Sequence, residues 1–136
     1  MEHKKFIGLN DDIIKIRTSV FIDEQGFKEE FDETDKICAH IVLYDNGQPI
    51  AVCRYFKEGS NYHIGRIAII KEYRGKHFGS KIIQTAENEI KNEGGRAIEI
   101  SAQVRVSEFY EKLGYNKAGS IYFDEYCEHI RMIKNL

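Results

Sequence analysis

The feature that most constrains this chain is the stretch from residue 66 to residue 81, which reads RIAIIKEYRGKHFGSK. An unbroken β-type run over residues 67–70 leads through a short basic turn with glycines, residues 74–79, into an amphipathic segment. Such a turn gathers the unpaired N–H groups of the next helix, and the helix dipole adds positive charge there. The stretch therefore predicts a strand–turn–helix unit that binds a phosphate-bearing ligand.

Apolar periodicity places this unit inside a mixed sheet. A helix with one apolar stripe ends at a pair of glycines, residues 94–95, and an Asn-Gly pair at 46–47 predicts a hairpin turn. Strands are expected at residues 4–10, 37–44, 49–56, 62–70, 96–101, 115–123 and 127–134, with helices from residue 10 or 11 to about 25, at 80–93 and at 106–113. This order predicts an α/β (mixed α+β) fold, with helices on the faces of a mixed sheet.

Size and charge narrow the functions that this chain can serve. With 136 residues, the chain is expected to form one domain. Its 20 basic and 22 acidic side chains give a net charge of −2, so the overall electrostatic potential does not favour nucleic-acid binding. The apolar runs are far too short to span a membrane and the first residues lack a signal-peptide pattern, so a soluble, cytoplasmic protein is expected. Three scattered cysteines and five histidines show no metal-ligand spacing, and no metal is expected.

Three kinds of phosphate loop compete for the glycine-containing turn. The nucleotidase pattern GxxxxGK[ST] fails because Gly75 and Gly79 are separated by three residues and Ser80 precedes Lys81. The dinucleotide pattern GxGxxG is absent. The turn from Arg74 to Gly79 instead resembles the [Q/R]xxGx[G/A] loop of the GNAT superfamily of acyl-CoA-dependent N-acyltransferases, with a histidine at position 77 in place of the inner glycine.

Two further patches support this resemblance in the same order along the chain. Residues 109–115, FYEKLGY, resemble the FYEKLGF segment of the superfamily, and residues 20–26, VFIDEQG, resemble a segment of its ElaA-like members. The chain is therefore identified as a member of the GNAT superfamily, ElaA-like subgroup. That membership implies a single domain over residues 1–136 with a mixed sheet of about six to seven strands, helices on both faces, and acetyl-CoA as co-substrate.

The resemblance also assigns catalytic candidates. Tyr110 has the position of the acid that protonates the departing thiolate, although a tyrosine simply packed on a helix is the competing reading. Glu24 and His40 are the candidates for a general base that faces the substrate cleft, and each could instead be structural. Many members of the family relay the proton through water, so a single base is not required.

Contacts to CoA are expected from two parts of the chain. In the family, backbone N–H groups of the strand before the loop stabilise the developing oxyanion, and the pantetheine arm adds to the sheet there. Gln103 and Lys112 stand where the family often contacts CoA, although a solvated lysine is the alternative for Lys112. The predicted cofactor-binding set is Ile67, Ala68, Ile69, Ile70, Arg74, Gly75, Lys76, His77, Phe78, Gly79, Ser80, Gln103, Phe109, Tyr110 and Lys112.

The expected reaction is direct transfer of an acetyl group to a primary amine, carried by a small molecule or a peptide. Cys53 is the only thiol that could carry the acyl group, and its apolar setting indicates a core residue. The acidic segment at residues 29–35 could attract a cationic amine, but we expect a solvated loop. Homodimers are common in the family, and no feature fixes the oligomeric state. The alternatives are a catalytically weak acyl-CoA-binding or interaction module on the same fold, and a nucleotide-binding regulatory domain.

Overall fold

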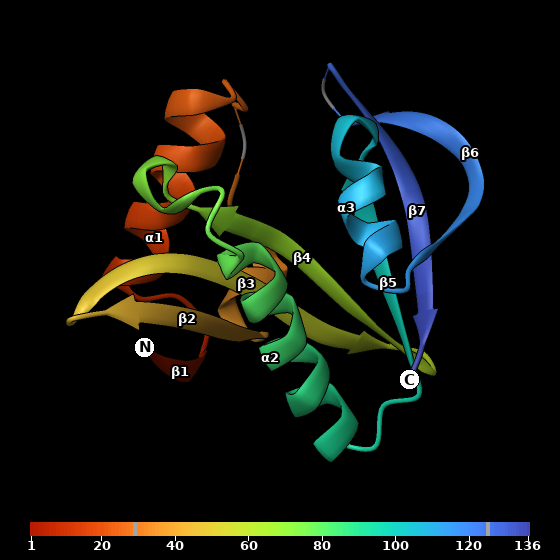
Figure 1. The fold of residues 1–136 in the computed structure, drawn as a ribbon, viewed down its shortest axis with the longest axis horizontal. Helices are drawn as coiled ribbons and strands as arrows, with labels where there is room; N and C mark the ends of the chain where they lie inside the picture. Colours follow the sequence, from red (N-terminus) through yellow and green to blue (C-terminus); the bar gives the residue numbers. More distant parts are fainter. Residues whose placement is uncertain (29, 125) are drawn as a thin grey trace.

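The computed structural model of the chain describes residues 1–28, 30–124 and 126–136. Within these residues the strands form one seven-stranded sheet in the order β1-β2-β3-β4-β5-β7-β6 (Figure 1). Only β4 and β5 run parallel, and the other neighbours are antiparallel. The strands are β1 (Glu2–Ile7), β2 (Ala39–Asp45), β3 (Gln48–Glu58), β4 (Asn61–Ile69), β5 (Ala97–Gln103), β6 (Asn116–Asp124) and β7 (Cys127–Asn135).

The first helix begins where the Asn10 carboxamide oxygen accepts a hydrogen bond from the N–H of Ile13. This helix, α1 (Asp11–Arg17), continues directly as a π-helix, η1 (Thr18–Glu24). The long helix α2 (Phe78–Asn92) joins β4 to β5, and α3 (Ser107–Lys112) joins β5 to β6. Three short 3-10 helices complete the described elements: η2 (Glu33–Lys36), η3 (Lys71–Tyr73) and η4 (Val104–Val106).

The sheet has an apolar core on each face. Ile13, Ile16 and Val20 from the first helical segment pack against Val42 and Val52 on one face. On the other face α2 and α3 bury their apolar stripes against the sheet, through Ile82, Ile83, Ala86, Ile90 and Tyr110 among others. The predicted α/β class, the seven strands and the helices on both faces are therefore confirmed (Figure 1).

The parallel pair β4–β5 separates soon after it forms. Only residues 62–64 of β4 pair with residues 98–100 of β5, and beyond them the two strands diverge (Figure 1). On its other side β4 carries a β-bulge against β3, where Arg66 adopts a left-handed φ of 49°. Because a bulge bends its strand and increases its twist, it accompanies the divergence of β4 from β5.

Several predicted boundaries differ from the observed ones. The first strand begins and ends earlier than expected, at Glu2 and Ile7, because Gly8 leaves the sheet with a φ of +85°. Residues 18–24 form a π-helix, which the periodicity did not distinguish from an α-helix. The last helix is a 3-10 turn followed by the short α3. Among the described residues no helix is long and apolar enough to cross a membrane.

The expectation of a solvated acidic loop is wrong for most of that segment. Glu30 and Asp35 are buried, and Asp32 receives hydrogen bonds from Arg54 at 2.7 and 3.1 Å. The Arg17 guanidinium, itself fully buried, donates to Glu30 and to Asp35 at 2.6 Å each. Buried carboxylates need such partners, because an unpaired buried charge costs several kcal/mol. Glu29 lies outside the described residues.

Candidate active site

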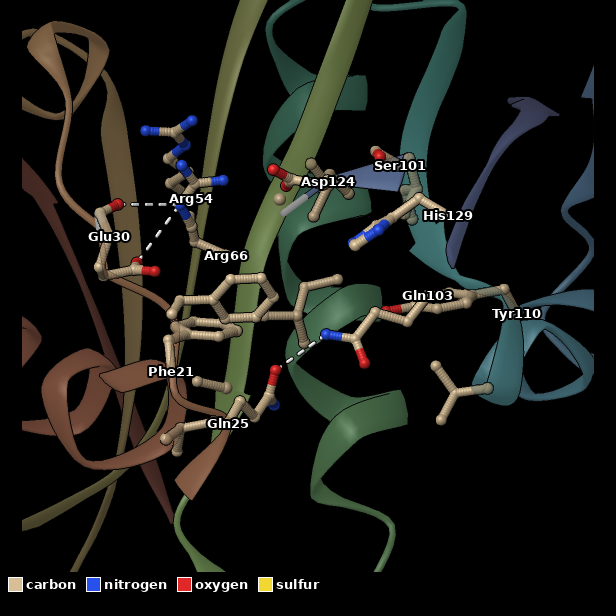
Figure 2. A pocket seen from close by; sticks show the side chains of 18 of the residues that line it. Phe21, Gln25, Glu30, Arg54, Arg66, Ser101, Gln103, Tyr110, Asp124 and His129 are labelled. Atoms are coloured by element: carbon tan, nitrogen blue, oxygen red, sulfur yellow. Dashed lines mark hydrogen bonds and ion pairs between the residues drawn. The ribbon is translucent and has the colours of Figure 1, made fainter. Parts of the chain in front are cut away.

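The separation of β4 from β5 opens a pocket of about 470 Å³ in the sheet. Its walls come from the diverging residues 65–69 of β4, from β5 and β7, and from the end of the first helical segment. In Figure 2, Glu30, Arg54 and Arg66 lie on one wall, and Ser101, Asp124 and His129 lie on the opposite one. The pocket therefore has a charged, polar half and lies at the C-terminal ends of two parallel strands, where α/β proteins bind their ligands.

Tyr110 is in the wall of this pocket, as predicted from its sequence position. Its side chain comes from α3 and reaches toward the pocket interior, and the residue is 8% exposed (Figure 2). Burial raises the pKa of the phenol to about 12, and the nearby Cys53 adds to that rise. The hydroxyl therefore keeps its proton throughout the neutral range and can act as a proton donor.

The basic turn ends at the N-terminus of α2, as the sequence predicted. His77 is the residue before the helix and has a left-handed backbone, with a φ of 68° and ψ of 16°. Its side chain is exposed. This conformation suits glycine, which is the residue that the family pattern has at this position. The histidine therefore preserves the backbone path of the loop at a local cost in conformational energy.

Two glycines of this turn serve different purposes, a left-handed backbone at Gly75 and close packing at Gly79. Gly75 has a φ of +76° and open space beside its Cα. A Cβ built on Gly79 would lie 3.1 Å from Cζ of Phe109, so the predicted Phe109 packs directly against the loop. Lys76, Phe78 and Ser80 lie in the same turn, near the first N–H groups of α2, which have no partner within the helix. The turn thus offers the donors that a pyrophosphate needs.

Arg74 and Glu24 meet each other in a bidentate ion pair. Both terminal nitrogens of Arg74 donate to the Glu24 carboxylate at 2.8 Å, and Arg74 Nε donates to the carbonyl of Ile69 at 3.0 Å. The hydrogen bond from Arg74 holds the pKa of Glu24 below its usual value. Arg74 lines the pocket, whereas Glu24 is not in its wall. The expectation that Glu24 faces the cleft as a base is therefore not met, because its carboxylate is committed to Arg74.

His40 is also not where the sequence analysis expected it. The side chain is fully buried and is absent from the pocket wall. Its Nε2 lies 3.1 Å from Nη1 of Arg17 and 3.4 Å from Oδ1 of Asp35. Burial, reinforced by Arg17, lowers the pKa of the imidazole to about 4, so His40 is neutral and accepts a hydrogen bond from Arg17. It is a member of the buried charge network and does not face the cleft.

Some of the remaining residues predicted to bind the cofactor line the pocket, and others lie outside it. Ile67, Ala68 and Ile69 line the pocket through β4, whereas Ile70 lies outside it and donates its N–H to the carbonyl of Ile50 at 3.0 Å. Gln103 lines the pocket and donates to the side chain of Gln25 at 2.9 Å, which ties β5 to the end of η1 (Figure 2). Lys112 is exposed in the last turn of α3.

One group of residues in the described part of the chain has the spacing of a metal site: Asp35, Cys38 and His40. Arg17 donates to Asp35 at 2.6 Å, and Arg54 donates to the same carboxylate at 2.8 Å. Two guanidinium groups already neutralise the carboxylate that a cation would need. The donor set therefore fits an arginine-bridged cluster and does not fit a metal.

A family model described as an acetyltransferase (GNAT) domain matches residues 11–136. The chain belongs to the GNAT acetyltransferase family. A Bacillus subtilis (strain 168) relative named as an acetyltransferase is 34% identical over 125 residues, which are 88% of this chain and 85% of the relative. The N-acetyltransferase YjcF of the same organism, itself uncharacterised, is 29% identical over 97% of this chain and 99% of its own length. The protein is thus an acyltransferase.

Solved structures agree with this GNAT assignment. A crystal structure described as an N-acetyltransferase from Lactobacillus plantarum superposes with a TM-score of 0.90 at 26% identity, over 100% of this chain and 99% of that one. ElaA from Escherichia coli has a TM-score of 0.86 at 22% identity, over 98% of both chains, and shares the fold. An aminoglycoside 6'-N-acetyltransferase, solved in complex with coenzyme A, also shares the fold with a TM-score of 0.77 at 15% identity and 99% and 97% coverage.

Several polar residues that line this GNAT pocket were not identified from the sequence, among them Gln25, Arg54, Arg66 and His129. Arg54 and Arg66 belong to strands that looked apolar, and their pairing with Glu30 and Asp32 depends on the fold of a distant loop. His129 lies on β7, which pairs with β5 only in the folded sheet. The alternation of polar with apolar residues along β7 is the one sequence signal that could have indicated its face.

Proposed function

We propose that this GNAT acetyltransferase moves an acetyl group from acetyl-CoA directly to a primary amine within a ternary complex. The observation that carries the proposal is the divergence of β4 from β5 at the end of β4 that leads into the α2 loop. The edge of β4 that faces the opening has no strand partner beyond residue 64 among the described pairs. Such an edge can pair with an extended, amide-containing arm, as in β-augmentation.

The protein residues fit the parts of such a co-substrate. The N-terminus of α2 and the turn before it would hold the pyrophosphate, and backbone N–H groups of residues 67–69 would stabilise negative charge on the thioester oxygen. Acetyl-CoA supplies the activated acyl group. Tyr110, protonated in the pocket wall, would give its proton to the departing thiolate.

The state of Cys53 supports direct transfer without an acyl-enzyme. This cysteine is fully buried within the core on the α2 face, and burial raises the pKa of its thiol to about 12. A thiol becomes a good nucleophile only as the thiolate, so Cys53 is poorly suited to carry an acyl group. We further propose that residues 1–136 act as a single domain, because two cores share one sheet.

The loop assignment can be tested with a matched pair of variants at Gly79. Gly79→Glu places a carboxylate beside the proposed pyrophosphate, and Gly79→Gln has nearly the same size without the charge. Both meet the ring of Phe109, whose Cζ lies 3.1 Å from the new Cβ, so both share the same steric cost. In a calorimetric titration with CoA, the glutamate variant should lose binding and the glutamine variant should retain more of it. Equal affinities of the two variants for CoA would show that the pyrophosphate does not bind at this loop.

Turnover distinguishes an enzyme from a binding module. Thiol release from acetyl-CoA, measured over a panel of amines and peptides, should reveal at least one acceptor whose acetylated product is found by mass spectrometry. Thermal stabilisation by acetyl-CoA without any turnover would favour the acyl-CoA-binding module. Stabilisation by ATP but not by CoA would favour a nucleotide-binding regulatory domain.

A further inference from the structure

We propose that His129 removes the proton from the acceptor amine. This inference rests on the proposed acetyl transfer and names a residue for its one unassigned step. An alkylammonium group is not nucleophilic, so the enzyme must generate the neutral amine in the pocket. Neither Glu24 nor His40 reaches the pocket wall, whereas His129 lines it and is only 6% exposed.

The hydrogen bond that His129 makes fixes which of its nitrogens is basic. Nδ1 lies 3.0 Å from the carbonyl oxygen of Cys127, two residues earlier on β7. A carbonyl oxygen can only accept, so Nδ1 carries the hydrogen of the neutral ring. The lone pair is therefore on Nε2, the nitrogen farther from the backbone. This arrangement, with one ring nitrogen donating to a fixed acceptor and the other free to take a proton, is the one that a general base needs.

The strands on either side hold the imidazole in place. Gln103 of β5 and Tyr122 of β6 are its register partners, so all three side chains are on one face of the sheet. The Tyr122 ring stacks on the imidazole with centroids 6.0 Å apart and an interplanar angle of 28°. Figure 2 shows the ring of His129 directed into the pocket, on the wall opposite Arg54 and Arg66.

Several of the other groups near the imidazole are paired with residues outside the reaction. The Tyr122 hydroxyl is hydrogen-bonded to Ser101, and Arg131 donates to Glu99 at 2.6 Å. His63 lies between Glu58 and Glu99, with nitrogen–oxygen distances of 3.8 and 3.6 Å. The charged or titratable groups that share this pocket or the neighbouring strand positions are Glu30, Arg54, His63, Arg66, Arg74, Glu99, Arg105, Tyr110, Tyr122, Asp124, Cys127, Glu128 and Arg131.

The acceptor nitrogen loses two protons during the reaction, and a different residue takes each of them. Nε2 of His129 takes the first proton from the ammonium and later releases it to solvent. The amine nitrogen then forms a bond to the thioester carbonyl carbon, and the carbon–sulfur bond breaks. Tyr110 gives its proton to the departing thiolate and recovers one from the nitrogen, so that the products are the amide, the free thiol and one proton.

Two substitutions of His129 separate this role from a structural one. His129→Asn can keep a donor near the position of Nδ1 for the Cys127 carbonyl but has no Nε2, whereas His129→Gln puts an unbasic amide at the far position. Both should lower kcat by roughly 10²- to 10⁴-fold, the usual contribution of a general base. Both should also lose the decline of kcat/KM at acid pH. His3→Gln, on the exposed β1, serves as the control with unchanged activity.

Readouts other than turnover complete the test. Calorimetry with acetyl-CoA and thermal melting should give wild-type values for the asparagine variant, and ¹⁵N NMR of the imidazole should show the proton on Nδ1. Unchanged kcat in both variants, a proton on Nε2, or loss of the acid decline in His63→Gln instead would each overturn the proposal for His129. Absence of turnover by the wild-type protein over the whole amine panel would instead overturn the proposed function.

Discussion

The phenol of Tyr110 lies in the wall of the pocket where we propose that the two substrates meet. It is 8% exposed, and burial raises its pKa to about 12, so the hydroxyl is protonated wherever the enzyme works. The ring packs edge-on against Phe109 and Tyr115, with centroids 5.1 and 6.2 Å away. This packing fixes the position of the ring, so the hydroxyl is the group available for proton transfer.

Removing that hydroxyl should affect catalysis more than binding. Tyr110→Phe keeps the ring and its contacts, so we expect kcat to fall by roughly ten- to a thousand-fold, as for a lost general acid, with little change in the Kd for CoA. Steady-state kinetics and calorimetry measure the two quantities. Leu113→Met on the same segment is a packing control, which should leave kcat unchanged. An unaltered kcat in Tyr110→Phe would exclude the phenol from the mechanism.

The left-handed backbone of His77 leads to a second prediction at the residue scale. A side chain in the left-handed region costs roughly 1–2 kcal/mol, and a glycine there avoids most of this cost but adds entropy to the unfolded chain. His77→Gly should therefore raise the free energy of unfolding by up to about 1 kcal/mol and preserve CoA binding. Lys76→Gly, a neighbour without a positive φ, should be neutral or destabilising. Urea denaturation compares them, and a His77→Gly variant that is clearly less stable would contradict the strain argument.

At the scale of elements, a network of three arginines and three carboxylates fastens the segment around η2 to the sheet. Arg17 comes from α1, Arg54 from β3 and Arg66 from the bulge of β4, and each pairs with Glu30, Asp32 or Asp35. Burial acts against ionisation of Asp35, but hydrogen bonds from Arg17, Arg54 and the Asp32 backbone hold its pKa well below the usual range. Glu30, Arg54 and Arg66 of this network also line the pocket, so the network joins the stability of this segment to the shape of the pocket.

His40 makes the network sensitive to acid. Its pKa is lowered from 6.5 to about 4 in the folded protein, so the unfolded chain binds the proton first as the pH falls. Stability should be fully present above pH 6.5 and decline toward pH 4, by roughly 3 kcal/mol at most if the whole shift is realised. Loss from Asp32 and Asp35 follows only below about pH 4, because their folded pKa values are lowered, whereas burial raises the pKa of Glu30.

A substitution isolates this histidine. His40→Gln can keep an acceptor for Arg17 but has no proton to gain, so its free energy of unfolding should vary less between pH 6.5 and pH 4 than that of the wild type. His3→Gln, on the exposed β1, should show the wild-type slope. Urea denaturation at stepped pH values gives the comparison. Parallel curves for His40→Gln and wild type would show that His40 is not the responsible group.

The strands, the helices and the place of the glycine-containing turn before α2 were predicted from the sequence better than the charged half of the pocket was. The loop and Tyr110 belong to short contiguous motifs, so their local order was sufficient to place them. The charge network was missed because Arg17, Arg54 and Asp35 meet only through tertiary contacts, and a run of acidic residues normally indicates solvation. His40 was misplaced for the same reason, because the groups that bury it, Arg17 and Asp35, reach it only through tertiary contacts.

At the scale of the whole molecule, a single sheet carries both walls of the pocket. Strands β2 to β4 contribute to both cores and β4 leads into the proposed cofactor loop, whereas β5 and β7 complete the core on the α2 face and, with β6, supply the wall with Ser101, His129 and Asp124. Among the described residues, the one parallel pair between them, β4–β5, holds for three residues before it opens. The fold therefore places the open edge of β4, where we propose that the cofactor binds, and the wall with His129 on opposite sides of one gap.

The central claim is that both substrates meet in this gap and react there without an acyl-enzyme. The most direct measurement is the initial rate of thiol release with acetyl-CoA and an active amine varied together, with the acetylated amine identified by mass spectrometry. Intersecting double-reciprocal lines, and no acetyl group left on the protein when the amine is omitted, are the expected result. Parallel lines with an acetylated cysteine, or tight binding of acetyl-CoA with no amide formed from any amine, would contradict the account.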